Sequence, residues 1–122
     1  MSEQTNIIKI KSFAFASRIV KLYKYLAVKK NEFILAKQIL RSGTSVGALF
    51  RESQNAESTA DFIHKLAIAQ KECDETLFWL ELLKENDYLT EKQFESIYSE
   101  GNELLKIIRS VTLTTKQKIQ KI

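Results

Sequence analysis

Residues 58–83 read STADFIHKLAIAQKECDETLFWLELL, and the periodicity of this stretch is the clearest indication of the fold class. Its apolar and small residues alternate at spacings of four and three, at Phe62, Leu66, Ala69, Cys73, Thr76, Leu80 and Leu83. That spacing places one stripe of side chains along a single face of an α-helix. Ser58, followed three residues later by Asp61, resembles a capping box and predicts the helix start. We therefore expect a helix over residues 58–86.

Three further helices are predicted over residues 12–30, 32–56 and 90–115. Ser12 and Thr90 are favourable N-caps for the first and last of them. The helix over residues 32–56 carries two apolar seams, so it needs two neighbouring helices, or a bundle together with a partner chain. The Thr-Leu-Thr-Thr run at 112–115 weakens the case for helix beyond it, so the basic tail 116–122 is expected to fray.

Turn-forming residues are scarce, because the 122 residues include three glycines and no proline. An all-β fold needs many turns, so long helices with short connections are the favoured arrangement. Short connections make successive helices run antiparallel. We predict one all-α domain spanning residues 1–122, an antiparallel up-down-up-down four-helix bundle that self-associates.

The composition argues against a zinc site, a membrane span and a secretory signal peptide. Cys73 and His64 are the single cysteine and the single histidine, so one chain cannot build a Cys/His zinc site. A lone cysteine suits a reducing cytoplasm. No apolar run approaches the ~20 residues of a membrane span, and residues 1–11 lack the features of a signal peptide. We expect a cytoplasmic protein with no metal, cofactor, membrane partner or small-molecule substrate.

The charged residues are unevenly distributed around a net charge of +4. Residues 1–30 carry seven bases and one acid, residues 57–87 carry three bases and eight acids, and residues 104–122 carry five bases and no acid. Basic ends around an acidic middle indicate either an anionic partner or self-association between unlike surfaces. Lys and Arg side chains bind phosphates independently of nucleotide sequence. The candidates for that contact are Lys9, Lys11, Lys21, Lys24, Lys37, Arg41, Arg51, Lys116, Lys118 and Lys121. Alternatively, these residues lie on a solvated helix face, or they form intersubunit salt bridges to the acidic third helix.

Three patterns that could carry catalysis or bind a metal have simpler structural interpretations. The stretch Gly43–Gly47 matches G-x-S-x-G, but a nucleophile elbow needs a preceding strand, and the preceding residues are helical in pattern. One helix face carries Glu57, Asp61 and His64, but a single histidine cannot supply a di-iron site, and a solvated face is favoured. The carboxylates of the third helix form no evident pocket that would split their pKa values. These are Glu72, Asp74, Glu75 and Glu81. We therefore do not expect an enzyme.

Two glycines and two aromatic residues are candidates for packing or interface contacts. Gly43 and Gly47 lie one turn apart, and glycine in a helix costs about 1 kcal/mol relative to alanine. Their presence therefore indicates close packing or contact with a ligand backbone. Phe78 and Trp79 cannot both face the core, so one of them is a candidate interface residue. Six aromatic residues are too scattered for a platform that stacks single-stranded bases, and most of them are expected in the core. They are Tyr23, Tyr25, Phe78, Trp79, Tyr88 and Tyr98.

Several motifs resemble the bacterial four-helix bundle protein family, also described as 23S ribosomal RNA intervening-sequence proteins. They are RSGTSVGA at 41–48, ADFIHK at 60–65, AIAQKECDET at 67–76 and WLELL at 79–83, with RIVKLY at 18–23 near the start. The family is similar to the accessory protein of diversity-generating retroelements, which assembles as a pentameric barrel and binds nucleic acid. The resemblance thus implies a homo-oligomer, a pentamer, with RNA or DNA as partner. This chain departs from the common pattern at Leu49, where many members carry Asn, so any polar role of that Asn is absent.

Two function classes follow from these observations, with an enzyme as a remote third. The first is a non-enzymatic, homo-oligomeric protein that binds RNA or DNA through a basic surface. The second is a protein–protein assembly or scaffold module with no affinity for nucleic acid. Binding that weakens steeply with salt distinguishes the first class from the second.

Overall fold

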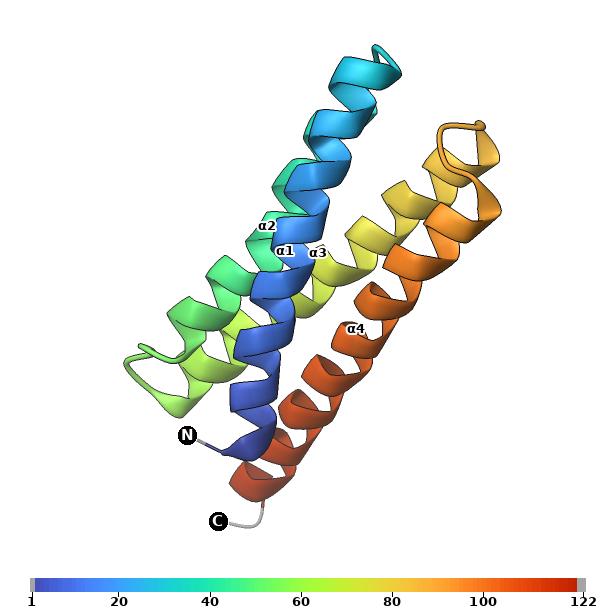
Figure 1. Ribbon diagram of the computed structural model, residues 1–122. Helices are drawn as coiled ribbons and strands as arrows, with labels where there is room; N and C mark the ends of the chain where they lie inside the picture. The colour runs from blue at the N-terminus through green and yellow to red at the C-terminus, as the bar shows by residue number, and fades with distance from the viewer. Residues whose placement is uncertain (1, 121–122) are drawn as a thin grey trace.

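The computed structural model describes residues 2–120, and it is built from four α-helices (Figure 1). Their bounds are α1 Glu3–Lys29, α2 Ile34–Ser53, α3 Thr59–Glu85 and α4 Glu91–Gln120. The described residues contain no strand. Each helix packs against two others, in the cyclic order α1, α2, α3, α4. The predicted all-α four-helix bundle is confirmed.

The first helix begins at Glu3 rather than at the expected Ser12. Ser2 is the N-cap, and its hydroxyl accepts a hydrogen bond from the backbone N–H of Thr5 at 3.2 Å. Ser12 is instead buried, and its hydroxyl donates to the carbonyl of Lys9 at 3.3 Å. The sequence pattern could not separate these serines because Ser12 also satisfies the N-cap preference. It lies on the inward face because it is four residues after Ile8.

The last helix continues through Gln120, beyond the expected end at residue 115. Thr112 and Thr115 donate their hydroxyls to carbonyls four residues earlier, each at 2.8 Å. These bonds satisfy the hydroxyls within the helix, so the threonines do not interrupt it. The start of α4 follows the expected cap, since Thr90 and Gln93 exchange reciprocal side-chain to backbone hydrogen bonds at 3.1 and 2.9 Å.

The second helix is shorter than expected at both ends. Glu32 and Phe33 precede it, and the carboxylate of Glu32 accepts from the N–H groups of Leu35 and Ala36 at 2.5 and 3.3 Å. At the other end, residues 54–56 form the turn toward α3. The carboxylate therefore caps the helix from outside it and satisfies amides that the helix itself cannot.

The core is an apolar column along the bundle axis to which all four helices contribute. Its largest fully buried side chains are Ile8, Phe15, Ile19, Leu26, Ile39, Val46, Phe50, Leu66, Leu80, Leu83, Leu104 and Ile108. Two glycines allow side chains of neighbouring helices to pack closely against the helix backbone. A Cβ atom at Gly43 would lie 2.7 Å from Cγ1 of Ile19, and one at Gly101 would lie 2.9 Å from Cδ2 of Leu77. The termini and the α2–α3 turn lie at one end of the bundle, while the other two turns lie at the opposite end (Figure 1).

Candidate functional site

The charges of the folded chain separate between its two helical hairpins. The first 51 residues, which form α1 and most of α2, hold ten of the 19 bases and two of the 15 acids. That segment therefore has a net charge of +8, and the remaining segment has −4. We call α1 and α2 with their turn the basic hairpin, and α3 and α4 with their turn the acidic hairpin. The candidate phosphate-binding residues lie mainly on the basic hairpin.

Two of those candidates are engaged by carboxylates of the acidic hairpin. Lys11 pairs with Glu103 of α4 at 2.5 Å. Arg41 pairs with Glu72 of α3 at 3.0 Å and with Glu75 one turn later. These contacts join the two hairpins, and they direct both cations toward carboxylates of the same chain. The alternative interpretation from the sequence, salt bridges to the acidic third helix, thus describes Arg41, although within one chain and not between subunits.

Five other candidates are exposed on the basic hairpin, and none forms an ion pair with any residue between 2 and 120. They are Lys9, Lys21, Lys24, Lys37 and Arg51. Lys116 and Lys118 are exposed on the last turns of α4, at the end of the bundle where both termini lie (Figure 1). Lys121 lies outside the described residues. The available cations therefore fall into two groups, one on the basic hairpin and one at the end of α4.

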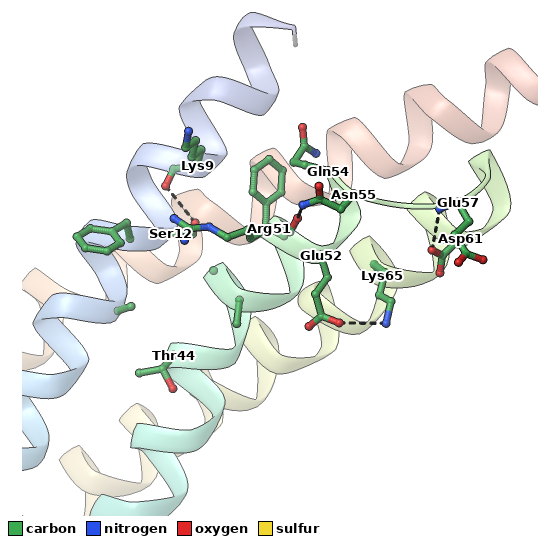
Figure 2. Close-up of a pocket in the computed structure, with 15 residues that line it drawn as sticks. Lys9, Ser12, Thr44, Arg51, Glu52, Gln54, Asn55, Glu57, Asp61 and Lys65 are labelled. Atoms are coloured by element: carbon green, nitrogen blue, oxygen red, sulfur yellow. Dashed lines mark hydrogen bonds and ion pairs between the residues drawn. The ribbon is translucent and has the colours of Figure 1, made fainter.

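A groove of about 920 Å³ lies between α1 and α2 near the α2–α3 turn. Lys9 and Arg51 line it from opposite helices, and Figure 2 shows Arg51 extending from α2 toward α1 near Ser12. Three acids also line it. Glu52 pairs with Lys65 at 3.2 Å, and Asp61 accepts from the backbone N–H of Glu57 at 3.2 Å. Two of the three carboxylates are thus engaged in local contacts, whereas both Lys9 and Arg51 remain exposed beside the groove.

The expected packing residues occupy different environments. Gly43 is buried against Ile19, but Gly47 lines the groove, where a Cβ atom would lie 3.4 Å from Oγ of Ser12. Trp79 is half-buried and donates its indole N–H to Glu75 at 3.2 Å. Phe78 is the exposed member of the aromatic pair, with 54% of its surface accessible.

Two sets of exposed residues were not predicted from the sequence as parts of a candidate site. The outward face of α1 carries three large apolar side chains, Ile10, Phe13 and Val20. Their spacing of three and seven residues places them on one helical face, opposite the buried seam, and this periodicity was the available signal. Lys29 and Lys30 are also exposed, at the C-terminus of α1, where cations are favoured by the helix dipole.

The patterns associated with catalysis have structural roles in the fold. Ser45 lies inside α2, and its hydroxyl donates to the carbonyl of Arg41 at 2.6 Å. Burial raises the pKa of the Cys73 thiol to about 12, while Asp74 adds to the rise and Arg109 opposes it. A thiol with that pKa carries almost no thiolate at neutral pH, and the thiolate is the nucleophile.

Among residues 2–120, no group of three or more His, Cys, Asp and Glu side chains is arranged to hold a metal ion. Across the same part of the chain, no helix is both long and apolar enough to cross a membrane.

A family model described as 23S rRNA-intervening sequence protein matches residues 4–110. The chain is similar to a crystal structure of a protein of unknown function from the S23 ribosomal protein family of Bacteroides thetaiotaomicron VPI-5482. The two share 51% sequence identity and a TM-score of 0.88, over 89% of this chain and 97% of that one. No curated protein matches the chain.

Proposed function

Because the chain belongs to the 23S rRNA-intervening sequence protein family, we propose that it is a non-enzymatic protein that binds RNA or DNA through the basic hairpin. The observation that carries this proposal is the separation of charge between the two hairpins. Five exposed cations of the basic hairpin have no carboxylate partner among residues 2–120. Such cations gain free energy by neutralising phosphates and releasing the counterions of a nucleic acid.

The arrangement of these cations suits an extended polyanion. Lys9, Lys21 and Lys24 all lie on α1, and the interval from Lys9 to Lys24 spans about 22 Å at the usual helical rise. Arg51 lies across the groove from Lys9, on α2. Contacts spread along a helix and across a groove match a backbone that carries a phosphate at each nucleotide. This recognition is independent of sequence and is expected to be strongly salt-dependent.

The test measures binding of a labelled structured RNA and a DNA duplex across a salt series. The proposal predicts a linear fall of log K with log salt, with a slope that reports the number of phosphate contacts. Lys21→Gln with Lys24→Gln should reduce the magnitude of that slope by roughly 1.8 for B-form DNA. The matched control is Lys71→Gln with Lys92→Gln, which removes the same charge from the acidic hairpin. Absence of binding at low salt, or equal effects of both double variants, would contradict the proposal.

Self-association is the second candidate function, and the exposed apolar residues of α1 favour it. Phe13 is 71% exposed on the basic hairpin, and Phe78 is exposed on α3 near the exposed acids Asp74 and Glu81. Opposite charges around two separate apolar positions suit a head-to-tail contact, in which the α1 face of one copy packs on the α3 face of the next. Contacts of this kind close into a ring when the rotation between successive copies completes a circle, and they otherwise form open filaments. The pentamer implied by the family resemblance would be one such ring, and the mass of the protein in solution tests it.

A further inference from the structure

The end of α1, the turn after it and the start of α2 expose three large apolar side chains that the bundle does not bury. Val28 and Ile34 are each 76% exposed, and Phe33 is 48% exposed. The buried seam of α1 ends at Leu26, so the chain beyond it has no core to enter. Figure 1 shows this turn at the end of the bundle away from both termini. We call residues 28–34 the apolar tip.

Cations surround the apolar tip on both helices. Lys24, Lys29, Lys30 and Lys37 are all exposed, and none pairs with a carboxylate between residues 2 and 120. Glu32 is the one acid between residues 24 and 37, and its carboxylate accepts from the first amides of α2. That carboxylate is therefore oriented toward the helix terminus. The tip thus presents an apolar surface within a positively charged border.

We propose that the apolar tip contacts the unpaired bases of a single-stranded nucleic acid, whose phosphates bind the surrounding lysines; this rests on the proposed function. A duplex conceals its base faces within the stack and presents charged backbone, which gives an apolar tip nothing to pack against. An unpaired strand exposes base faces, and these stack on aromatic side chains beside a basic surface. The Phe33 ring supplies the planar surface, and Val28 and Ile34 supply apolar contact around it.

The alternation of apolar and basic groups fits the chemistry of an unpaired strand. Each nucleotide joins one apolar face to one phosphate, and the tip places Phe33 within a few residues of Lys29, Lys30 and Lys37. A lysine also accompanies an aromatic ring beside the tip, where Nζ of Lys30 lies 5.9 Å from the centroid of the Tyr25 ring. Recognition by stacking tolerates any base, so the preference concerns strandedness and not sequence.

The experiment measures the affinity of a single-stranded oligonucleotide and of the same sequence as a duplex, each across a salt series. Phe33→Ala should weaken single-strand binding by about fivefold to a hundredfold, which corresponds to one stacked base. Its salt slope should remain that of the wild type, since no charge is removed. The duplex affinity of Phe33→Ala should equal that of the wild type. Phe33→Trp, which keeps an aromatic ring, should bind the single strand as tightly as the wild type does. The matched control is Leu113→Ala, which removes a comparably exposed apolar side chain from α4 of the acidic hairpin.

The outcomes separate this inference from the proposed function. Equal binding of single strand and duplex, with no effect of Phe33→Ala, overturns the inference and leaves the basic hairpin as a phosphate-binding surface. No binding of either nucleic acid overturns both. Sedimentation with vesicles of phosphatidylcholine and phosphatidylglycerol tests a lipid surface as the occupant. Vesicle binding that requires Phe33, with unchanged single-strand affinity in the Phe33→Ala variant, also overturns the inference. The melting temperature confirms that each variant is folded.

Discussion

Ile19 of α1 lies against the backbone of Gly43 of α2, so closely that a Cβ atom at position 43 would approach Cγ1 of Ile19 to 2.7 Å. Gly47, one turn further along α2, faces Ser12 with room for that atom at 3.4 Å. The two glycines that the sequence presents as a pair therefore differ in what they allow. Only Gly43 is required by close packing of the two helices.

This difference predicts opposite effects of alanine at the two positions. Gly43→Ala overpacks the core by about 1–3 kcal/mol, partly offset by a gain of about 1 kcal/mol in helix propensity. Gly47→Ala should gain stability by up to about 1 kcal/mol. Urea denaturation measures both changes. In an Ile19→Ala background, Gly43→Ala should cost less, because the crowded side chain is gone. Equal stability changes at the two glycines would show that the packing difference is absent.

Arg41 is predicted to be a structural cation and not a nucleic-acid contact. Its ion pairs with Glu72 and Glu75 are partly exposed, so Arg41→Gln should cost about 0.2–1 kcal/mol of stability. Nucleic-acid affinity should change little, whereas Lys24→Gln should weaken it. Urea denaturation and fluorescence anisotropy measure the two properties on the same proteins. A loss of affinity in Arg41→Gln as large as in Lys24→Gln would place Arg41 in the binding surface.

Head-to-tail assembly predicts a specific result when two defective variants are mixed. Phe13→Ser and Phe78→Ser should each reduce the mass measured by light scattering, because each removes one of the two contacting faces. An equimolar mixture should then form a heterodimer, because each variant retains the face that the other lacks. Absence of any association after mixing would contradict the head-to-tail contact. A wild-type mass of one chain would exclude self-association under those conditions.

Cys73 is predicted to be unreactive in the folded protein. Its folded-state pKa of about 12 lies above the ordinary value of 9.0, so folding favours the protonated thiol. The contribution of this group to stability is fully present below pH 9.0 and is lost as the pH rises toward 12. Alkylation by iodoacetamide at neutral pH should be slow in the native protein and fast in urea. Equal alkylation rates in the two states would contradict the burial of this thiol.

The periodicity of α3 predicted its structure well because its seam is regular. Leu66, Ala69, Cys73 and Leu80 are all buried at the expected spacings, and Ser58 caps the helix. The start of α1 could not be predicted as well, because Ser2 and Ser12 satisfy the same N-cap preference. Only the packing of the whole bundle places Ser12 inside it.

The candidate site was less predictable than the fold, because charge alone does not show what a side chain faces. Lys11, Lys24 and Arg41 are equivalent in the sequence as cations of the basic first 51 residues. In the fold, Lys11 and Arg41 pair with carboxylates of the acidic hairpin, while Lys24 forms no ion pair with any residue between 2 and 120. Exposure of Phe33 was also unpredictable, because it depends on where the core of the bundle ends.

Lysine footprinting tests most directly whether the basic hairpin is the nucleic-acid surface. The protein is acetylated with and without a bound single-stranded oligonucleotide, and mass spectrometry measures the modification of each lysine. We expect protection of Lys21, Lys24 and Lys37, with Lys71 and Lys92 of the acidic hairpin modified equally in both conditions. Protection of Lys71 and Lys92, or equal modification of all lysines despite measured binding, would contradict this expectation.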